Sequence, residues 1–259
     1  GKILSNKIFD KIIVPPAPHD AGCSIGSVLS HYYKNKNLNF QEDSKIKSGI
    51  MSPYLGFEYT EDEITNMFKK YSNYINFKLL KYNDVIEFTA EALAKNKIIA
   101  WFQGKDEIGP RALGNRSFLA NPSSEEIREI INKKIKKREL FRPFAPSVLS
   151  HEAKNYFELE QESPYMNIVA KVRKNKKNLI PAVVHVDGTC RVHTVSEKYN
   201  KKYFDLLTKF FEKSKIPVLL NTSFNINEPI VSSPKDAIET FLKSDVDYLI
   251  LENYVIQKL

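Results

Sequence analysis

The sequence GKDEIGPRALGNRS, at residues 104–117, is the most informative stretch of this chain. It places Lys105, Arg111 and Arg116 among glycines at positions 104, 109 and 114. Glycine lets a backbone approach a ligand closely and adopt conformations that other residues avoid. Arginine binds phosphate or carboxylate oxygens through two parallel hydrogen bonds. The stretch therefore predicts a loop that binds a phosphorylated ligand, although arginines beside glycines also occur in ordinary solvated loops.

A second basic group, KKRELFRPFAPS at residues 136–147, follows a predicted helix. Ser123 and Glu126 have the spacing of a capping box, and isoleucines at 127, 130, 131 and 135 form an apolar stripe. Lysines at the end of a helix are usually solvated, because cations suit that end of the helix dipole. Arg142 differs, since it stands between Phe141 and Pro143, and a charge among apolar residues needs a partner.

The third group, HVDGTCRVH at residues 185–193, follows the apolar run 182–184, which predicts a buried strand. Asp187-Gly188 marks a turn, and Arg191 then enters the next strand. His185 and His193 are candidate metal ligands, but histidines that flank a strand turn are more often structural. The group therefore adds one cation, Arg191, and does not favour a metal centre.

The fourth group is NTSFN at residues 221–225, directly after the short apolar strand 217–220. Consecutive small polar donors after a strand suit a cradle for phosphate or an oxyanion. The same residue types also make helix caps and Asx-turns, which is the simpler interpretation of this group taken alone.

The remaining pattern alternates helices and strands, as in an α/β protein. Helices are expected at 84–95, 127–135 and 200–213 and after Ser233-Pro234, where proline suits the first turn. Strands are expected at 98–102, 147–149, 165–171, 183–186, 218–220, 248–251 and 253–257.

In this order, the motifs GPRALGNRS, RELFRPFAPSV, HVDGTCRV and LLNTSFN resemble the C-terminal domain of the O-carbamoyltransferase family of the NodU and CmcH type. The resemblance extends from about Phe9 to Val255. It implies an α/β fold, a YrdC-like twisted mixed sheet with flanking helices. The related threonylcarbamoyl-adenylate synthases carry an S-x-N signature that corresponds to Ser223-Phe224-Asn225.

Residues 13–33 resemble the tail of the family's N-terminal domain, which has the actin/Hsp70-type ATPase fold. Asp20 matches a metal-binding carboxylate there, and the implied metal of the complete domain is iron or another divalent ion. The family's histidine pair, H-x-x-x-H, does not occur in this sequence. The resemblance implies a remnant of that domain at 1–40, a linker at 41–62 and the YrdC-like domain at 63–259. The rest of the N-terminal domain is expected either upstream in a longer protein or in a partner subunit.

The resemblance also implies an activity. The family forms carbamoyl-adenylate from carbamoyl phosphate and ATP, and transfers the carbamoyl group to a hydroxyl of a small-molecule acceptor, whose identity stays open. Such chemistry depends on positioning and on cations that stabilise charge. The match assigns the phosphates and the carbamoyl oxygen to Arg111, Lys136, Arg142 and Arg191. It assigns ATP and phosphate binding to Lys105, Arg116, Asn221, Thr222, Ser223 and Asn225, with Mg²⁺ held largely by phosphate oxygens and water.

The composition agrees with this interpretation. The formal net charge of +8 suits anionic ligands, but 39 basic against 31 acidic residues is not extreme, and a nucleic-acid partner is not expected. Cys23 and Cys190 are too few for a disulfide framework, which favours a reducing, cytoplasmic compartment. No signal peptide and no apolar run of membrane-spanning length is found, so no membrane partner is expected.

Two other classes of function stay open. A threonylcarbamoyl-adenylate synthase acting in tRNA modification would share the basic site, but such enzymes lack GPRALGNRS and the Asp20 segment in this form. A non-catalytic nucleotide-binding module would keep the core pattern and lose some basic positions, whereas none is lost here.

Overall fold

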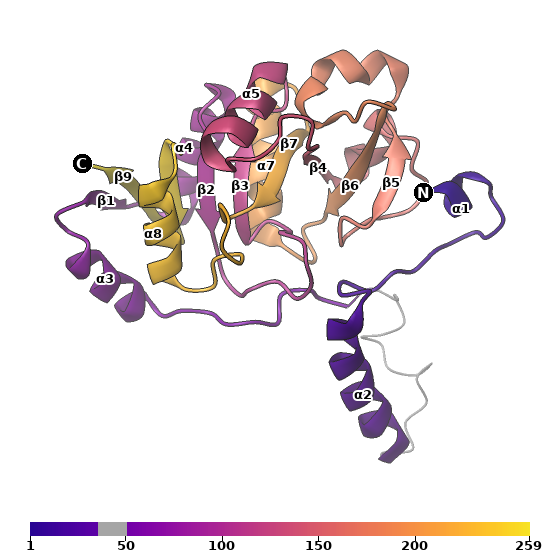
Figure 1. The fold of residues 1–259 in the computed structure, drawn as a ribbon, viewed down its shortest axis with the longest axis horizontal. Coiled ribbons are helices and arrows are strands. Elements are labelled where there is room, and N and C mark those ends of the chain that lie inside the picture. Colours follow the sequence, from indigo (N-terminus) through magenta and orange to yellow (C-terminus); the bar gives the residue numbers. More distant parts are fainter. Residues whose placement is uncertain (36–50) are drawn as a thin grey trace.

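The structure of the protein, a computed structural model, describes residues 1–35 and 51–259 (Figure 1). Residues 36–50 lie outside the described residues, and with them the end of the expected remnant at 1–40 and the start of the expected linker at 41–62. The described chain is built on a nine-stranded sheet in the order β1-β9-β8-β2-β3-β7-β4-β6-β5. Helix α2 (Asp20–Asn35) extends away from this sheet.

The sheet is mixed, because β2 pairs parallel with β8 and β4 pairs parallel with β6, while the other neighbours are antiparallel. The strands are β1 (Ile75–Leu79), β2 (Ile99–Phe102), β3 (Arg116–Ala120), β4 (Ala145–Leu149), β5 (Ile168–Lys171), β6 (Thr189–Val195), β7 (Val218–Ser223), β8 (Tyr248–Leu251) and β9 (Tyr254–Lys258). The other helices are α1 (Lys2–Ser5), α3 (Glu61–Lys70), α4 (Tyr82–Ala94), α5 (Glu125–Ile130), α6 (Ala153–Tyr156), α7 (Lys201–Ser214) and α8 (Pro234–Lys243).

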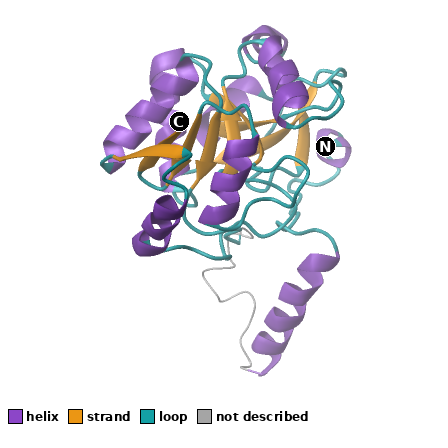
Figure 2. Cartoon of the chain, turned by 60° about the vertical axis from the view of Figure 1, so that its left-hand side comes forward, coloured by secondary structure: helices purple, strands orange, loops and turns teal. Residues whose placement is uncertain are grey.

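Helices cover both faces of the sheet (Figure 2). On one face α4 and α7 pack together and bury Leu93 and Leu207 with Trp101 of β2. The opposite face buries Phe241 of α8 with Phe118 of β3 in a second cluster. Burial of apolar side chains on both faces is what holds such a layered fold together. The expected α/β fold, a mixed sheet with flanking helices, is confirmed.

The strand directions bring the four sequence groups to one end of the sheet. Because β7 is antiparallel to both β3 and β4, its C-terminal end lies beside the N-terminal ends of those two strands. Strand β6 is parallel to β4, so the turn that precedes β6 lies at the same end. The loop between β2 and β3, which carries the first group, also lies there, because these two strands are antiparallel neighbours.

Two local predictions are wrong. The expected strand at 183–186 is a 3₁₀ turn, Pro181–Val183, followed by a loop. Its apolar residues Ala182 and Val183 are buried, but Ala182 N–H bonds to Pro122 O at 3.1 Å and not to a neighbouring strand. The capping box of Ser123 and Glu126 is also wrong, because α5 begins one residue later with Ser124 as its N-cap.

The segment 51–57, which falls in the expected linker, runs beside the loop between β2 and β3. Asp106 N–H bonds to Phe57 O at 3.0 Å, and Ile108 N–H bonds to Pro53 O at 2.7 Å. Gly56 N–H completes the pairing through Asp106 O at 3.1 Å. This part of the chain therefore supports the loop between β2 and β3 from outside the sheet. We call this loop, residues 103–115, the Gly/Arg loop.

Candidate active site

Lys136, Ser223 and Asn225 form one cluster at the end of β7. The Lys136 ammonium bonds to the carbonyl oxygens of Ser223 and Asn225 at 2.5 and 2.8 Å. It also bonds to Ser223 Oγ at 3.1 Å and Asn225 Oδ1 at 2.8 Å. Only 3% of Lys136 is exposed. Burial, and then the charge of Arg138, lower the pKa of Lys136 to about 7.

The position of Lys136 follows from the end of its helix. After α5 the chain widens into a π-helical turn, Ile131–Ile135, in which Lys136 N–H bonds to Ile131 O at 2.7 Å. Ile131 and Ile135 are buried, which fixes this turn against the sheet and directs Lys136 inward. Lys137 then reverses the chain with φ of +47° and is exposed, in agreement with the expectation that the lysine run is mostly solvated.

Arg111 and Arg191 form a second basic group. Burial, and then the charge of Arg111, lower the pKa of Arg191 to about 10, which indicates that the two guanidinium groups lie within electrostatic reach. Arg191 Nη2 contacts Met166 Sδ at 3.8 Å, and Arg191 Nε is buried without a hydrogen-bond partner in the described part. Within residues 1–35 and 51–259, neither guanidinium has a carboxylate at ion-pair distance. Two neighbouring cations without a counter-charge suit an anionic ligand.

Asn221 and Thr222 occupy β7 just before Ser223. Asn221 is buried, and its Nδ2 donates to Ala112 O at 3.1 Å and to Ser147 Oγ at 2.9 Å. The structure therefore places Asn221 behind the Gly/Arg loop, where it fixes the residue next to Arg111. Thr222 is half-buried and pairs with Phe118 of β3.

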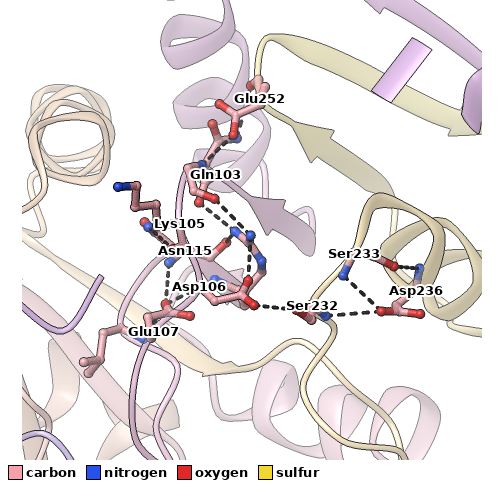
Figure 3. A network of polar contacts seen from close by, with 12 residues as sticks. Gln103, Lys105, Asp106, Glu107, Asn115, Ser232, Ser233, Asp236 and Glu252 are labelled. Carbon is pink, nitrogen blue, oxygen red and sulfur yellow. Dashed lines mark hydrogen bonds and ion pairs between the residues drawn. The ribbon is translucent and has the colours of Figure 1, made fainter. Parts of the chain in front are cut away.

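Arg116 lies inside the protein, where both terminal nitrogens of its guanidinium have partners and its Nε has none among the described residues. The residue is 1% exposed, and Nη2 pairs with Asp106 Oδ1 at 2.7 Å. Its Nη1 donates to Gln103 O at 2.7 Å, and the guanidinium lies 3.5 Å from the centre of the Phe102 ring. Figure 3 shows Asp106 between this network and Ser232. The Asp106 carboxylate accepts a hydrogen bond from the Ser232 hydroxyl. Arg116 is thus positioned to close the loop between β2 and β3 rather than to face a ligand.

Arg142 is exposed and pairs with Glu139 Oε2 at 2.9 Å. Its neighbour Phe141 is 81% exposed, so the expected apolar surroundings of Arg142 are not found. The prediction that Arg142 is pinned among apolar residues is wrong, because the segment before β4 projects into solvent.

Lys105 and Asp20 stand apart from both clusters. Lys105 is exposed and points away from the polar network of Asp106 and Asn115 (Figure 3). Asp20 begins α2, with Ala21 N–H bonded to Nδ1 of His19 at 3.3 Å. In the part of the chain that the structure describes, no three His, Cys, Asp or Glu side chains are grouped to hold a metal ion. A metal at Asp20 therefore needs ligands from outside these residues.

The two histidines of the third group have structural partners. His193 Nδ1 lies 2.8 Å from Ser147 Oγ, and burial lowers the pKa of His193 to about 3. His185 Nδ1 contacts Thr189 Oγ1 at 3.3 Å, and burial lowers its pKa as well. Both are therefore neutral at neutral pH, as expected for structural histidines.

Arg138 is a cation of the site that the sequence did not single out. Its Nε donates to Asn132 Oδ1 at 2.8 Å, and its guanidinium lies 4.9 Å from the centre of the Phe144 ring. Burial and the nearby charge of Arg142 lower its pKa. The apolar Phe144 six residues later was the available signal, because arginine stacks on aromatic rings.

Residues 90–258 match the family model described as carbamoyltransferase C-terminus. The whole chain is 43% identical to nodulation protein NolNO of Sinorhizobium fredii and covers 38% of it. It is 33% identical to 3'-hydroxymethylcephem-O-carbamoyltransferase of Amycolatopsis lactamdurans, over 85% of this chain and 38% of the relative. Among solved structures, T. kodakarensis HypF aligns with a TM-score of 0.47 at 19% identity, over 71% of this chain and 23% of HypF.

The chain spans between 38% and 46% of the length of the curated relatives that it matches over its full extent. In the described ranges, no helix is both long and apolar enough to cross a bilayer.

Proposed function

This chain belongs to the carbamoyltransferase family, and we propose that it forms carbamoyl-adenylate from carbamoyl phosphate and ATP. The carbamoyl group is then passed to a hydroxyl of a small-molecule acceptor. The acceptor site belongs to the rest of the longer protein or to a partner subunit, since the relatives extend well beyond the matched region.

The observation that carries the proposal is the pair of guanidinium groups of Arg111 and Arg191. The charge of Arg111 lowers the pKa of Arg191, and neither has an acidic partner in the described residues. Like charges held together in this way repel each other until an anion enters. Arginine forks match the oxygens of phosphate, so both substrates can supply that anion.

Lys136 supplies a third cation with a different property. Among the described residues its ammonium bonds to neutral acceptors alone, on Ser223 and Asn225, and its pKa of about 7 leaves it partly deprotonated at neutral pH. An arriving phosphate raises that pKa, because an opposite charge favours the ammonium form. The cluster therefore gains a full positive charge when substrate binds.

The chemistry needs no nucleophilic side chain. Joining a carbamoyl oxygen to the α-phosphorus of ATP breaks the bond to pyrophosphate, and carbamoyl phosphate releases its phosphate to water. Carbamoyl phosphate, ATP and water thus become carbamoyl-adenylate, pyrophosphate and phosphate. We assign stabilisation of the charge on these oxygens to Arg111, Arg191 and Lys136, with Ser223 and Asn225 as hydrogen-bond donors. Mg²⁺ accompanies ATP and is held largely by phosphate oxygens and water.

Asp20 is assigned to the metal-dependent transfer of the carbamoyl group, in the part of the protein that precedes the sheet. The residues described around it do not form a metal site by themselves. Its remaining ligands therefore come from the upstream part of a longer protein or from a partner.

The test is release of pyrophosphate and phosphate by the purified chain. We expect release of both when ATP and carbamoyl phosphate are present together, and no pyrophosphate when either is omitted. A second arm replaces carbamoyl phosphate with threonine and bicarbonate. Pyrophosphate release in that arm alone would assign the chain to the threonylcarbamoyl-adenylate synthases, and release in neither arm by folded protein would contradict adenylate formation.

A further inference from the structure

The carboxylate of Glu107 holds the loop between β2 and β3 from inside. Its Oε1 accepts hydrogen bonds from the backbone N–H groups of Leu113, Asn115 and Arg116, at 2.9, 2.7 and 3.2 Å. A carboxylate that accepts several backbone N–H groups fixes that backbone strongly, because charge-assisted hydrogen bonds are the strong ones. Figure 3 shows Glu107 beside Asn115 at the base of this loop.

The same loop is held from outside by two further bonds. Ala112 O accepts from Asn221 Nδ2 at 3.1 Å, and Leu113 O accepts from Tyr54 Oη at 2.8 Å. Gly114 has φ of +100°, and a Cβ at this position would lie 2.2 Å from the Tyr203 ring. The backbone that follows Arg111 is therefore fixed on every side.

Arg111 itself is exposed, with no hydrogen bond or ion pair to the residues that the structure describes. The backbone beside Arg111 is thus fixed, while its guanidinium has no partner among these residues. This arrangement is preorganised to bind an anion. We propose that Glu107 is the positioning residue that holds Arg111 beside Arg191, and that it thereby sets the affinity of the site for phosphate groups. The inference rests on the proposed function for the identity of the anion, a phosphate-bearing substrate.

The physical reason is the entropy of the loop. Without the negative charge of the carboxylate, the hydrogen bonds from these three backbone N–H groups weaken, and the residues around Arg111 gain conformational freedom. Each ligand that binds must then order the loop, and this cost in free energy weakens the binding that goes through Arg111 specifically. Removing Glu107 should therefore matter only while Arg111 is present.

A double-mutant cycle with inorganic pyrophosphate as the probe tests this coupling. Binding to the purified protein is measured by calorimetry for wild type, Glu107→Gln, Arg111→Ala and the double variant. Glu107→Gln keeps the shape of the side chain and removes its charge. We expect it to weaken pyrophosphate binding about tenfold in the wild-type background and less than about twofold in the Arg111→Ala background. Thermal melting checks that each variant is folded.

Two further variants complete the design. Tyr54→Phe removes the hydroxyl group and with it the bond to Leu113 O, and it should show the same dependence on Arg111 if Glu107→Gln does not fold. Glu63→Gln is the matched control, because Glu63 Oε2 accepts a backbone N–H from Thr60 at 2.8 Å at the start of α3. It should leave pyrophosphate binding unchanged.

The outcomes separate this inference from the proposed function. Equal weakening by Glu107→Gln, or by Tyr54→Phe, with and without Arg111 would overturn it, because that is the result of a general structural role. Absence of pyrophosphate binding to the wild type would also overturn it. A wild type that binds pyrophosphate with the expected coupling, but makes no carbamoyl-adenylate, would support the inference and contradict only the proposed reaction.

Discussion

The ammonium group of Lys136 donates a hydrogen bond to Asn225 Oδ1 at 2.8 Å and so joins residues 89 positions apart in the sequence. This bond connects the segment after α5 to the segment after β7 at one end of the sheet. In the part of the chain that the structure describes, the four acceptors of the ammonium are neutral oxygens of Ser223 and Asn225. No carboxylate is bonded to Lys136 in this cluster, although the charge of Glu228 acts on it from further away, and its positive charge is available to an anionic substrate.

Lys136 should leave a signature in the dependence of stability on pH. Its folded pKa of about 7 lies below the ordinary value of 10.5, so between these values the unfolded chain binds more protons than the folded one. The contribution of Lys136 to the free energy of unfolding therefore rises with pH, by up to about 1.4 kcal/mol per pH unit. Urea titrations between about pH 7 and 9 should show this slope in wild type and a smaller one in Lys136→Met. Equal slopes would contradict the lowered pKa.

Arg111→Ala and Arg142→Ala should lower the rate of adenylate formation by different amounts. The backbone that follows Arg111 is fixed, and its side chain has no partner among the described residues, so its loss should remove about 3 kcal/mol of transition-state stabilisation. Arg142 is exposed and bonded to Glu139, so Arg142→Ala should lower the rate of adenylate formation by less. The measurement is kcat/KM for pyrophosphate release, with Lys137→Ala as the control because Lys137 is exposed in the same segment. A loss with Lys137→Ala as large as that with Arg111→Ala would indicate a diffuse basic surface instead.

Arg116 should contribute to folding and not to substrate binding. Its buried guanidinium pairs with Asp106 at 2.7 Å and donates to Gln103 O at 2.7 Å. Arg116→Met leaves Asp106 without this partner, which should lower the free energy of unfolding by about 3 kcal/mol. Chemical denaturation measures this loss, and Arg142→Met serves as a control that should change it by less than about 1 kcal/mol. An Arg116→Met protein of normal stability would contradict the structural role.

The sequence predicted most of the regular fold because the elements around the sheet have clear local signals. The strand at 98–102, the helix at 200–213 and the helix after Ser233-Pro234 are found as β2, α7 and α8. The edge strand β1 was not predicted, although its residues Ile-Asn-Phe-Lys-Leu alternate between apolar and polar, and only Ile75 of the five is buried. The run 182–184 is buried through tertiary contacts of a turn, and apolar composition alone does not distinguish that from a strand.

The sequence predicted the candidate site only in part, because burial and partners also decide the role of a side chain there. Residue type and order pointed to Lys136, Ser223 and Asn225, and the structure brings these three together. The arginines could not be separated in the same way, because the role of an arginine depends on burial and partners. Arg116 begins a strand whose next residues, Ser-Phe-Leu-Ala, are buried, and that apolar run was the available sign that Arg116 points inward.

Asp20→Ala should not alter adenylate formation. Asp20 begins α2, which extends away from the sheet, whereas the basic clusters lie at the end of β7 and on β6 (Figure 1). We expect pyrophosphate release by the variant to stay within about twofold of wild type, as for surface changes remote from a site. In the complete protein, the same change should abolish transfer to the acceptor. A large loss of pyrophosphate release with Asp20→Ala would contradict the separation of the two steps.

The central claim is that the guanidinium groups of Arg111 and Arg191, which have no carboxylate partner among the described residues, belong to a site that makes carbamoyl-adenylate. Mass spectrometry of the product formed from ATP, Mg²⁺ and carbamoyl phosphate tests it most directly. The account expects carbamoyl-adenylate with the wild-type chain, and about 100-fold less with Arg111→Ala or Arg191→Ala, each folded by circular dichroism. Absence of carbamoyl-adenylate from the folded wild-type chain, or its undiminished formation by both variants, would contradict the account.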